Sequence, residues 1–184
     1  MLRSFESIKP QFGSNCYIDD TAVVIGNVVI GNESSVWPLS VVRGDVNSIR
    51  IGDNTNVQDG SILHVSHKGV FNPEGGTLLI GNNVTVGHKV ILHACQIDDS
   101  CLIGMGSIVM DNALIEHHVM LGAGSLVPGG KVLESGYLWL GNPVKKIRPL
   151  TQEEKKFLDY SALHYVNLKD KTLKTSEEII SEEI

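Results

Sequence analysis

The chain has 184 residues, with 15 lysines and arginines against 21 aspartates and glutamates, so its formal net charge is −6. It shows neither a basic patch nor an apolar stretch of the roughly 20 residues that span a membrane, so we expect no nucleic-acid partner and no membrane partner. The first residues lack the apolar core of a secretory signal and the cysteine count is odd, which together predict a cytoplasmic protein.

Residues 1–17 are expected to form an N-terminal lead-in or cap, and a repeat of six residues follows it. One aliphatic residue stands at each repeated position, with a three-residue slip after Val42 and an insertion after Leu63. A hexapeptide period predicts an all-β solenoid of stacked parallel coils, here over residues 18–148. The repeated residues are Ile18, Val24, Ile30, Val36, Val42, Ile51, Val57, Leu63, Ile80, Val86, Leu92, Ile97, Ile103, Val109, Ile115, Leu121 and Val127.

Two segments leave the repeat. Residues 65–77 are rich in glycine, asparagine, proline and histidine, and we expect them to form an inserted loop, a place where function often lies. After Pro149, the segment Thr151-Gln-Glu-Glu154 has the pattern of a helix capping box and predicts a C-terminal helix over 149–170. Residues 171–184, which contain several glutamates, are expected to form a flexible acidic tail.

The period also aligns residues of successive coils on three flat faces, which we name A, B and C after Ile51, Val57 and Leu63. Side chains alternate along a strand, so the residue after an inward aliphatic points outward. On face C, the outward residues of three successive coils are then Arg43, His64 and His93, about 4.8 Å apart per coil. Two imidazoles at that spacing can share a metal ion whose Zn–N bonds are about 2.0–2.1 Å.

A third histidine is predicted on another edge of the same chain. His88 comes two residues after Val86, at the corner leaving face B, with Asp59 one coil below it. Extended backbone puts His88 roughly 15 Å from His93. The third ligand must therefore come from elsewhere, and a second subunit that places its own corner against face C would supply His88. Repetition of that contact closes a ring, most simply a homotrimer with interfacial metals.

Four segments resemble the γ-class carbonic anhydrases, a family of left-handed parallel β-helices, and in particular its small bacterial branch. They are VVRGDV (41–46), IGDNTNVQDGSILHV (51–65), IGNNVTVGHKVILHAC (80–95) and SGYLWLGNPVKKIRPL (135–150). The resemblance implies that His64 and His93 of one chain and His88 of its neighbour bind Zn²⁺, or Fe²⁺ or Co²⁺ in its place. It further implies reversible hydration of CO₂ to bicarbonate, by hydroxide formed at that metal.

The resemblance also assigns roles around the metal. Arg43 and Asp45 match a pair that forms a salt bridge across subunits, and Asp59 would orient a ligand or join that interface. Asn56 and Gln58 match polar residues that orient water or bicarbonate. Tyr160, on the C-terminal helix, is a further candidate to face the site.

The chain departs from the most active members of the family in two places. Val46 follows the RGD segment where they have a glutamate, and the 65–77 loop carries a single acid, Glu74, where theirs is acidic. His67 could carry protons instead, because its ordinary pKa is near neutrality. Two alternatives to CO₂ hydration therefore stay open: a metal-binding trimer with a structural or other hydrolytic role, and a hexapeptide-repeat acyltransferase that uses a histidine base and no metal. A redox role of Cys95 and Cys101 also stays open.

Overall fold

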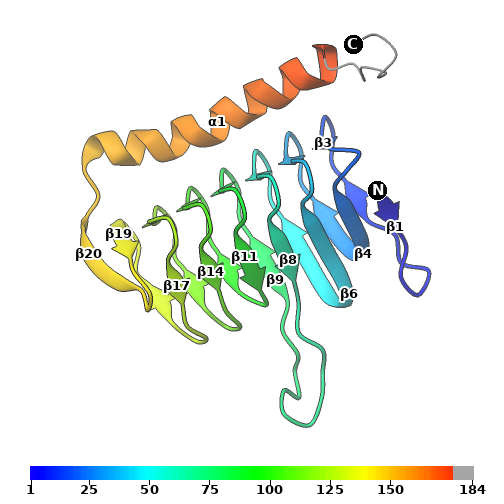
Figure 1. Ribbon diagram of the computed structural model, residues 1–184, viewed down its shortest axis with the longest axis horizontal. Coiled ribbons are helices and arrows are strands. Elements are labelled where there is room, and N and C mark those ends of the chain that lie inside the picture. Colours follow the sequence, from blue (N-terminus) through cyan, green and yellow to red (C-terminus); the bar gives the residue numbers. More distant parts are fainter. Residues whose placement is uncertain (176–184) are drawn as a thin grey trace, which may run out of the picture.

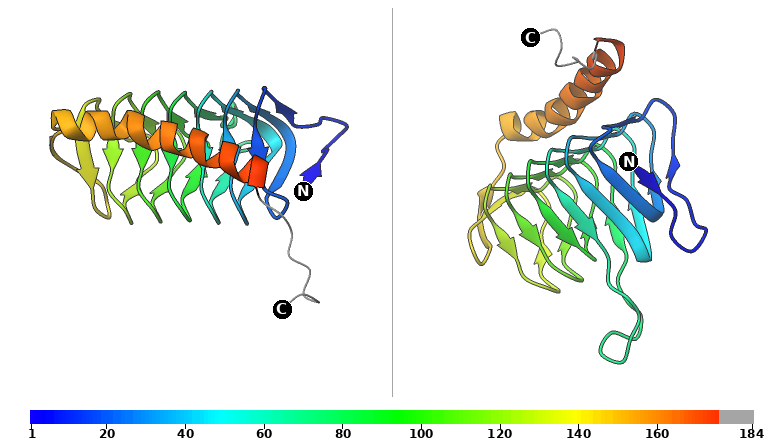
Figure 2. Two further views of the ribbon diagram at one scale, coloured as in Figure 1. Left: turned by 90° about the horizontal axis from the view of Figure 1, so that it is seen from above. Right: turned by 45° about the vertical axis from the view of Figure 1, so that its right-hand side comes forward.

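A computed structural model, which describes residues 1–175, shows a left-handed parallel β-helix with one long helix lying along it. The coils stack from the N-terminal end to the C-terminal end, and the helix runs back over them toward the first coil (Figures 1 and 2). The all-β solenoid predicted from the six-residue period is confirmed. Of the described helices, none is both long and apolar enough to cross a membrane.

The N-terminal residues extend the solenoid rather than lying apart from it. β1 (Leu2–Arg3) and β2 (Gln11–Phe12) both pair in parallel with β4 (Val23–Ile30). The segment predicted as a lead-in therefore contributes backbone hydrogen bonds to the first full coil and covers its edge, as an exposed sheet edge requires.

The remaining strands form the three predicted faces. Face A contains β9 (Leu78–Ile80), β12 (Gln96–Ile97), β15 (Leu114–Ile115) and β18 (Val132–Leu133). Face B contains β3 (Tyr17–Ile18), β5 (Ser35–Val36), β7 (Asn56–Val57), β10 (Thr85–Val86), β13 (Leu102–Ile103), β16 (Met120–Leu121) and β19 (Tyr137–Leu140). Face C contains β8 (Ile62–His64), β11 (Ile91–His93), β14 (Ile108–Val109) and β17 (Leu126–Val127).

The three-residue slip in the period has a structural reason. β6 (Val41–Ile51) is a single strand that passes from face C onto face A without a corner turn, and β4 does the same one coil earlier. Their pairing shifts register after Gly26, where the longer β6 accommodates extra residues. The shift keeps the inward aliphatics of both faces stacked in the later coils.

The core is a column of these aliphatics along the solenoid axis. Every repeated residue from Val24 to Val127 is at most 4% exposed, and Ile18 is packed against the same cluster. Burying one such side chain is worth about 1.5–3 kcal/mol, so the repeat supplies most of the apolar driving force of the fold.

The insertion after face C projects from one corner of the solenoid. It joins β8 to β9 and folds back on itself through antiparallel bridges between Ser66 and Gly76 and between Gly69 and Asn72. Val70 and Phe71, at its tip, are almost fully exposed.

The C-terminal helix α1 (Gln152–Thr175) follows β20 (Lys145–Pro149), which pairs antiparallel with β19. The capping box is confirmed, because Thr151 Oγ1 accepts from the Glu154 N–H at 3.1 Å and Glu154 Oε2 accepts from the Thr151 N–H at 2.9 Å. The helix continues five residues past the expected end at 170, and the rest of the expected tail lies outside the described residues.

α1 packs on face B, against β5, β7 and β10, through buried side chains that include Leu158 and Ala162. Its far end is held on the first coils by Lys169, whose fully buried side chain donates to Glu33 Oε2 at 2.6 Å and to Asp170 Oδ1 at 2.5 Å.

Candidate metal centre

His64 and His93 lie side by side on face C. The parallel pairing of β8 with β11 places them at equivalent positions of adjacent coils, and the pairing of Val42 with Leu63 puts Arg43 one coil earlier in the same column. His64 Nδ1 lies 3.2 Å from His93 Nε2. The backbone register therefore confirms the column of residues that counting along the repeat predicted.

The separation of the two nitrogens fits a shared metal ion. Two imidazole nitrogens, each about 2.0–2.1 Å from a tetrahedral Zn²⁺, are about 3.4 Å apart. The pair in this structure would need to open only slightly to hold the ion. The residues present therefore fit the metal that the resemblance implies.

Each of the two histidines has a carboxylate on its other ring nitrogen. Asp45 Oδ1 lies 3.1 Å from His64 Nε2, and Asp111 Oδ1 lies 2.6 Å from His93 Nδ1. A carboxylate in this position fixes the tautomer and the ring orientation of a ligating histidine and raises its basicity. The arrangement leaves His64 Nδ1 and His93 Nε2 as the two ring nitrogens available to a metal ion.

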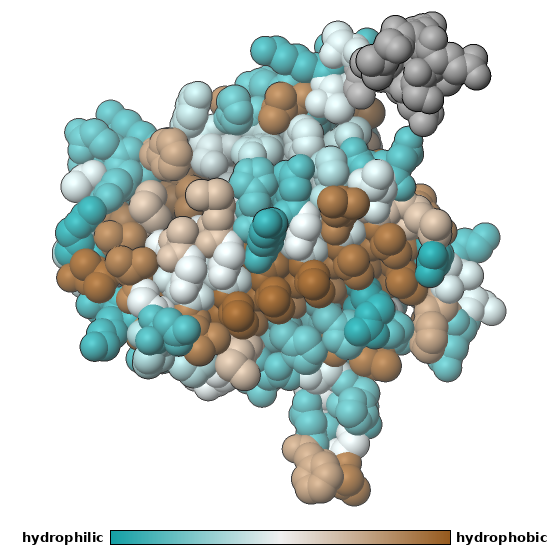
Figure 3. Space-filling model, viewed as in Figure 1, coloured by the Kyte–Doolittle hydropathy of each residue, from teal (hydrophilic) through white to brown (hydrophobic). Residues whose placement is uncertain are grey.

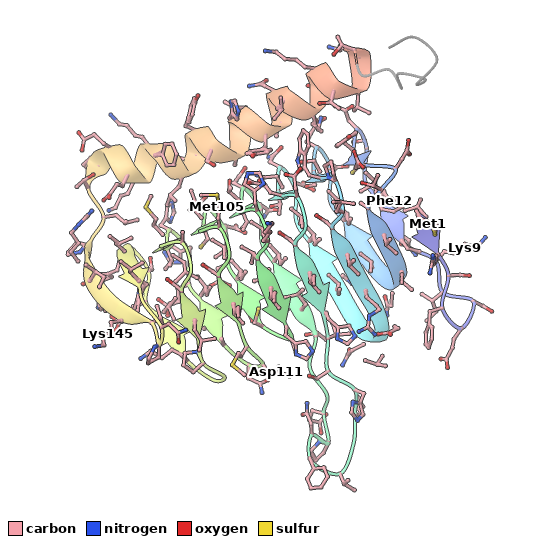
Figure 4. All side chains as sticks on the ribbon, viewed as in Figure 1. Met1, Lys9, Phe12, Met105, Asp111 and Lys145 are labelled. Atoms are coloured by element: carbon pink, nitrogen blue, oxygen red, sulfur yellow. The ribbon has the colours of Figure 1, made fainter. Side chains whose placement is uncertain are left out.

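Asp111 is a site residue that the sequence reasoning missed. It lies at the corner below face C, near the base of the 65–77 loop (Figure 4), and also accepts a hydrogen bond from Ser66. The signal was present in the period: Val109 is the next face C aliphatic after Leu92, so Asp111 follows it at the corner closest to His93. Assigning residues of the repeat to faces therefore predicts Asp111 as well, once the corner residues are assigned along with the strand residues.

The local charges favour neutral imidazole beside ionised carboxylate. Burial lowers the pKa of His64 below its ordinary value, and this outweighs the opposing effect of Asp45. Burial by itself would raise the pKa of Asp45, but hydrogen bonds from Arg43 and His64 lower it. In the same way, hydrogen bonds from Ser66 and His93 lower the pKa of Asp111 against the effect of its burial. A metal ligand must be a neutral imidazole, which these shifts favour for His64.

His88, on a different edge of the solenoid, also has a carboxylate on one of its ring nitrogens. Its Nδ1 lies 2.8 Å from Asp59 Oδ2, which leaves Nε2 free. His88 sits at the corner between faces B and C, beside the coil that carries Met105, whereas Asp111 marks the opposite edge of face C (Figure 4). Within residues 1–175 no three histidine, cysteine or carboxylate side chains of one chain are arranged to hold a metal ion.

Asn56 and Gln58 lie on face B under α1. Both are buried, and Gln58 Nε2 donates to Asn56 Oδ1 at 3.0 Å. Asn56 Nδ2 donates in turn to Thr85 Oγ1 at 3.2 Å, and Thr85 Oγ1 lies 3.0 Å from Ser161 Oγ on α1. The sequence reasoning missed Thr85 and Ser161, because no local signal shows which face of the helix meets β10.

Three other predicted residues have distinct surroundings. Arg43 contacts Asp45 of its own chain, so the salt bridge across subunits stays a prediction. Tyr160 is 60% exposed on α1, packs against Phe157 and His164, and does not contact the histidine pair within one chain. Val46 is exposed and presents no acid at the site.

A row of exposed apolar side chains crosses face C next to the histidine column. Ile62, Ile91 and Ile108 occupy equivalent outward positions of β8, β11 and β14 and are 37–45% exposed. Figure 3 shows the row as a continuous apolar band across this face. A contiguous apolar band on a protein surface marks an interaction site.

Comparison with known proteins agrees with the sequence motifs. The family described as bacterial transferase hexapeptide (six repeats) matches residues 9–44. Protein YrdA of Escherichia coli (strain K12) is 56% identical over 173 residues, covering 94% of each chain. A carbonic anhydrase of Geobacillus kaustophilus is 42% identical over 166 residues, covering 90% of this chain and 87% of its own.

Among solved structures, a hexapeptide transferase family protein from Anaplasma phagocytophilum superposes with a TM-score of 0.86 at 41% identity, covering 92% of this chain and 96% of its own. Relatives of this similarity over almost the whole length establish common ancestry. With its hexapeptide coils and its carboxylate-backed histidines, the chain belongs to the γ-carbonic-anhydrase-like family of hexapeptide-repeat β-helix proteins.

Proposed function

We propose that this protein is a γ-carbonic-anhydrase-like metalloenzyme that hydrates CO₂ reversibly to bicarbonate. The observation that carries the proposal is the pair His64 and His93, whose facing nitrogens are 3.2 Å apart and whose other nitrogens are held by Asp45 and Asp111. Two imidazoles so arranged leave coordination positions for a third protein ligand and for solvent, as in catalytic rather than structural zinc sites.

The third ligand is His88 of a neighbouring subunit in a homotrimer. His88 cannot reach the pair from its own edge, yet it has the same carboxylate backing as the other two histidines. The apolar row of Ile62, Ile91 and Ile108 lies beside the pair and offers the surface that a subunit contact would cover. A heterologous contact between that row and the corner bearing His88 closes a ring with one site per interface.

Around a bound ion, side chains of the protein would orient the imidazoles and form hydrogen bonds with water or bicarbonate. Zn²⁺ bound here would lower the pKa of water toward about 7 and so supply hydroxide for attack on CO₂ at neutral pH. Gln58 donates to Asn56, which leaves its Oε1 free to accept a hydrogen bond from water or bicarbonate. Asp45, Asp59 and Asp111 hold the three imidazoles in the tautomers that ligation needs.

The proton released by hydration finds no acidic relay at the two places where the most active family members carry one. Val46 is apolar, and Glu74 is the single acid of the 65–77 loop. We therefore expect proton release to limit turnover. The three cysteines are free thiols, which suits a reducing compartment such as the cytoplasm.

The test is metal analysis followed by stopped-flow CO₂ hydration. We expect about one metal per chain in the native protein, loss of metal in His93→Ala, and no loss in His117→Ala, whose ring contacts no carboxylate and no histidine of an adjacent coil among residues 1–175. The zinc- or iron-loaded protein should hydrate CO₂ above the buffer rate and sediment as a trimer. Full metal occupancy in His93→Ala would refute the site.

Two outcomes would favour the alternatives. A metal-replete trimer without hydration activity would favour a structural or other hydrolytic role, to which the absence of an acid at Val46 points. Turnover of an acyl-CoA that survives complete chelation would favour acyl transfer, a reading motivated by the structural neighbour named as a transferase.

A further inference from the structure

A chain of buried hydrogen bonds connects α1 to Gln58. It runs from Gln58 through Asn56 and Thr85 to Ser161, with separations of 3.0, 3.2 and 3.0 Å. All four side chains are at most 9% exposed. No sequence motif indicates Thr85 or Ser161, and neither lies among the candidate metal ligands.

Which group donates and which accepts in these hydrogen bonds follows from a neighbouring group that can only accept. Asn56 Nδ2 also lies within hydrogen-bond distance of the Val84 carbonyl, at 3.4 Å, and a carbonyl can only accept. The Asn56 amide therefore points its NH₂ group toward Thr85 and its oxygen toward Gln58. Gln58 must then donate through Nε2, and its Oε1 is the free end of the chain.

Thr85 connects Asn56 to Ser161 in this series of hydrogen bonds. Its hydroxyl accepts from Asn56 and has one proton left to donate, and Ser161 Oγ is the partner within reach. The two hydroxyls border a groove of about 320 Å³ between α1 and face B, whose other lining is mostly apolar and includes Leu102, Met120 and Leu138. These three apolar side chains offer the Thr85 proton no strong acceptor, and Gln58 also lines the groove.

We propose that Ser161 is a positioning residue that, through Thr85 and Asn56, fixes which atom of the Gln58 amide faces the metal site. Without the Ser161 hydroxyl, Thr85 can turn its proton toward Asn56, whose amide is then kept in its native orientation by the Val84 carbonyl alone. The reversed Asn56 amide then becomes more populated, and in that state the Gln58 amide turns as well, so that an NH₂ group replaces the accepting oxygen. The docking of α1 thereby controls the polarity of the site. This inference rests on the proposed function.

The first measurement is NMR of the Gln58 side chain in the native protein. The sequence has four glutamines, Gln11, Gln58, Gln96 and Gln152, so glutamine-selective ¹⁵N labelling gives few signals, and Gln58→Glu identifies the relevant one. In Ser161→Ala we expect solvent exchange of the Gln58 amide to quicken about fivefold, equivalent to about 1 kcal/mol, the net worth of one hydrogen bond.

Two further variants separate the hydrogen bonds from packing. Thr85→Val keeps the β-branched shape and should produce the same change, whereas Ser161→Thr keeps a hydroxyl and should restore slow exchange. Ser107→Ala is the matched control, because Ser107 is buried and donates to the Gly122 carbonyl without joining the hydrogen bonds that connect Ser161 to Gln58. It should leave the Gln58 signal unchanged.

The second measurement is CO₂ hydration by the loaded enzyme. We expect kcat to fall about fivefold in Ser161→Ala and Thr85→Val with KM unchanged, and to recover in Ser161→Thr. Exchange within twofold of the native rate in both Ser161→Ala and Thr85→Val would overturn the inference, as would faster exchange with an unchanged kcat. A native protein inactive with either metal would refute the proposed function instead, while the exchange rates would still decide whether Ser161 orients Gln58.

Discussion

Asp111 allows the strongest test of the histidine pair. Its Oδ1 lies 2.6 Å from His93 Nδ1, a short charge-assisted hydrogen bond that sets the tautomer in which Nε2 would bind the proposed metal. Removal of such a carboxylate costs about 10–100-fold in metal affinity. Because the side chains of His93 and Asp111 are more than a third exposed, solvent can replace part of the interaction, and we expect Asp111→Ala to weaken Zn²⁺ binding about tenfold, or about 1.4 kcal/mol.

The assay is competition for Zn²⁺ against a chromophoric chelator, with the assembled protein at neutral pH. Asp98→Ala is the control, because it removes the same charge from face A, where Asp98 accepts only from Gln96 at 2.9 Å. The control should retain native affinity. An Asp111→Ala affinity within twofold of the native value would show that the carboxylate does not orient a ligand.

Four further predictions concern the fold and its assembly. Burial raises the pKa of Cys95 and Cys101 to about 12, so neither thiol should react with a thiol reagent at pH 8 unless denaturant is added. Thr151→Ala should lower the free energy of unfolding by about 1 kcal/mol in a denaturant titration, because it removes the cap of α1. A hydrogen bond from Arg148 lowers the pKa of Glu154 from 4.5 to about 2, so its stabilisation is complete above about pH 4.5 and should be lost as the pH falls toward 2. Ile91→Glu should convert the proposed trimer to monomers in sedimentation, by placing charge in the apolar row.

Three of these predictions have a clear contradicting result. Rapid labelling of both cysteines in the native protein would show that the core opens readily. If the stability difference between the native protein and Glu154→Gln does not shrink between pH 4.5 and 2, Glu154 is not stabilised as a carboxylate in the folded state. Leu79→Glu, on face A with similar exposure, is the control for Ile91→Glu, and equal dissociation by both would refute face C as the interface.

The stacking of His64 and His93 shows how much of the site the sequence could predict. In a solenoid, residues one coil apart are neighbours in space, so counting along the repeat is equivalent to reading the backbone register. The count placed Arg43, His64 and His93 in one column, as the strand pairing does. The same regularity predicted the buried column from Val24 to Val127.

Counting along the repeat did not identify Asp111, Thr85 or Ser161. Asp111 lies at a corner, where the side-chain direction is set by turn geometry and not by strand alternation. Ser161 meets Thr85 because α1 docks at a particular angle and rotation on face B, which depends on packing and on the distant contact of Lys169 with Glu33.

The sequence by itself determined the architecture, the family and the histidine column, because all three depend on a period that local residue order sets. The tertiary structure decided which carboxylate holds each imidazole, where α1 meets face B and which atom of Gln58 is free. Those choices depend on contacts between residues distant along the chain, such as Ser161 with Thr85, for which no local pattern exists.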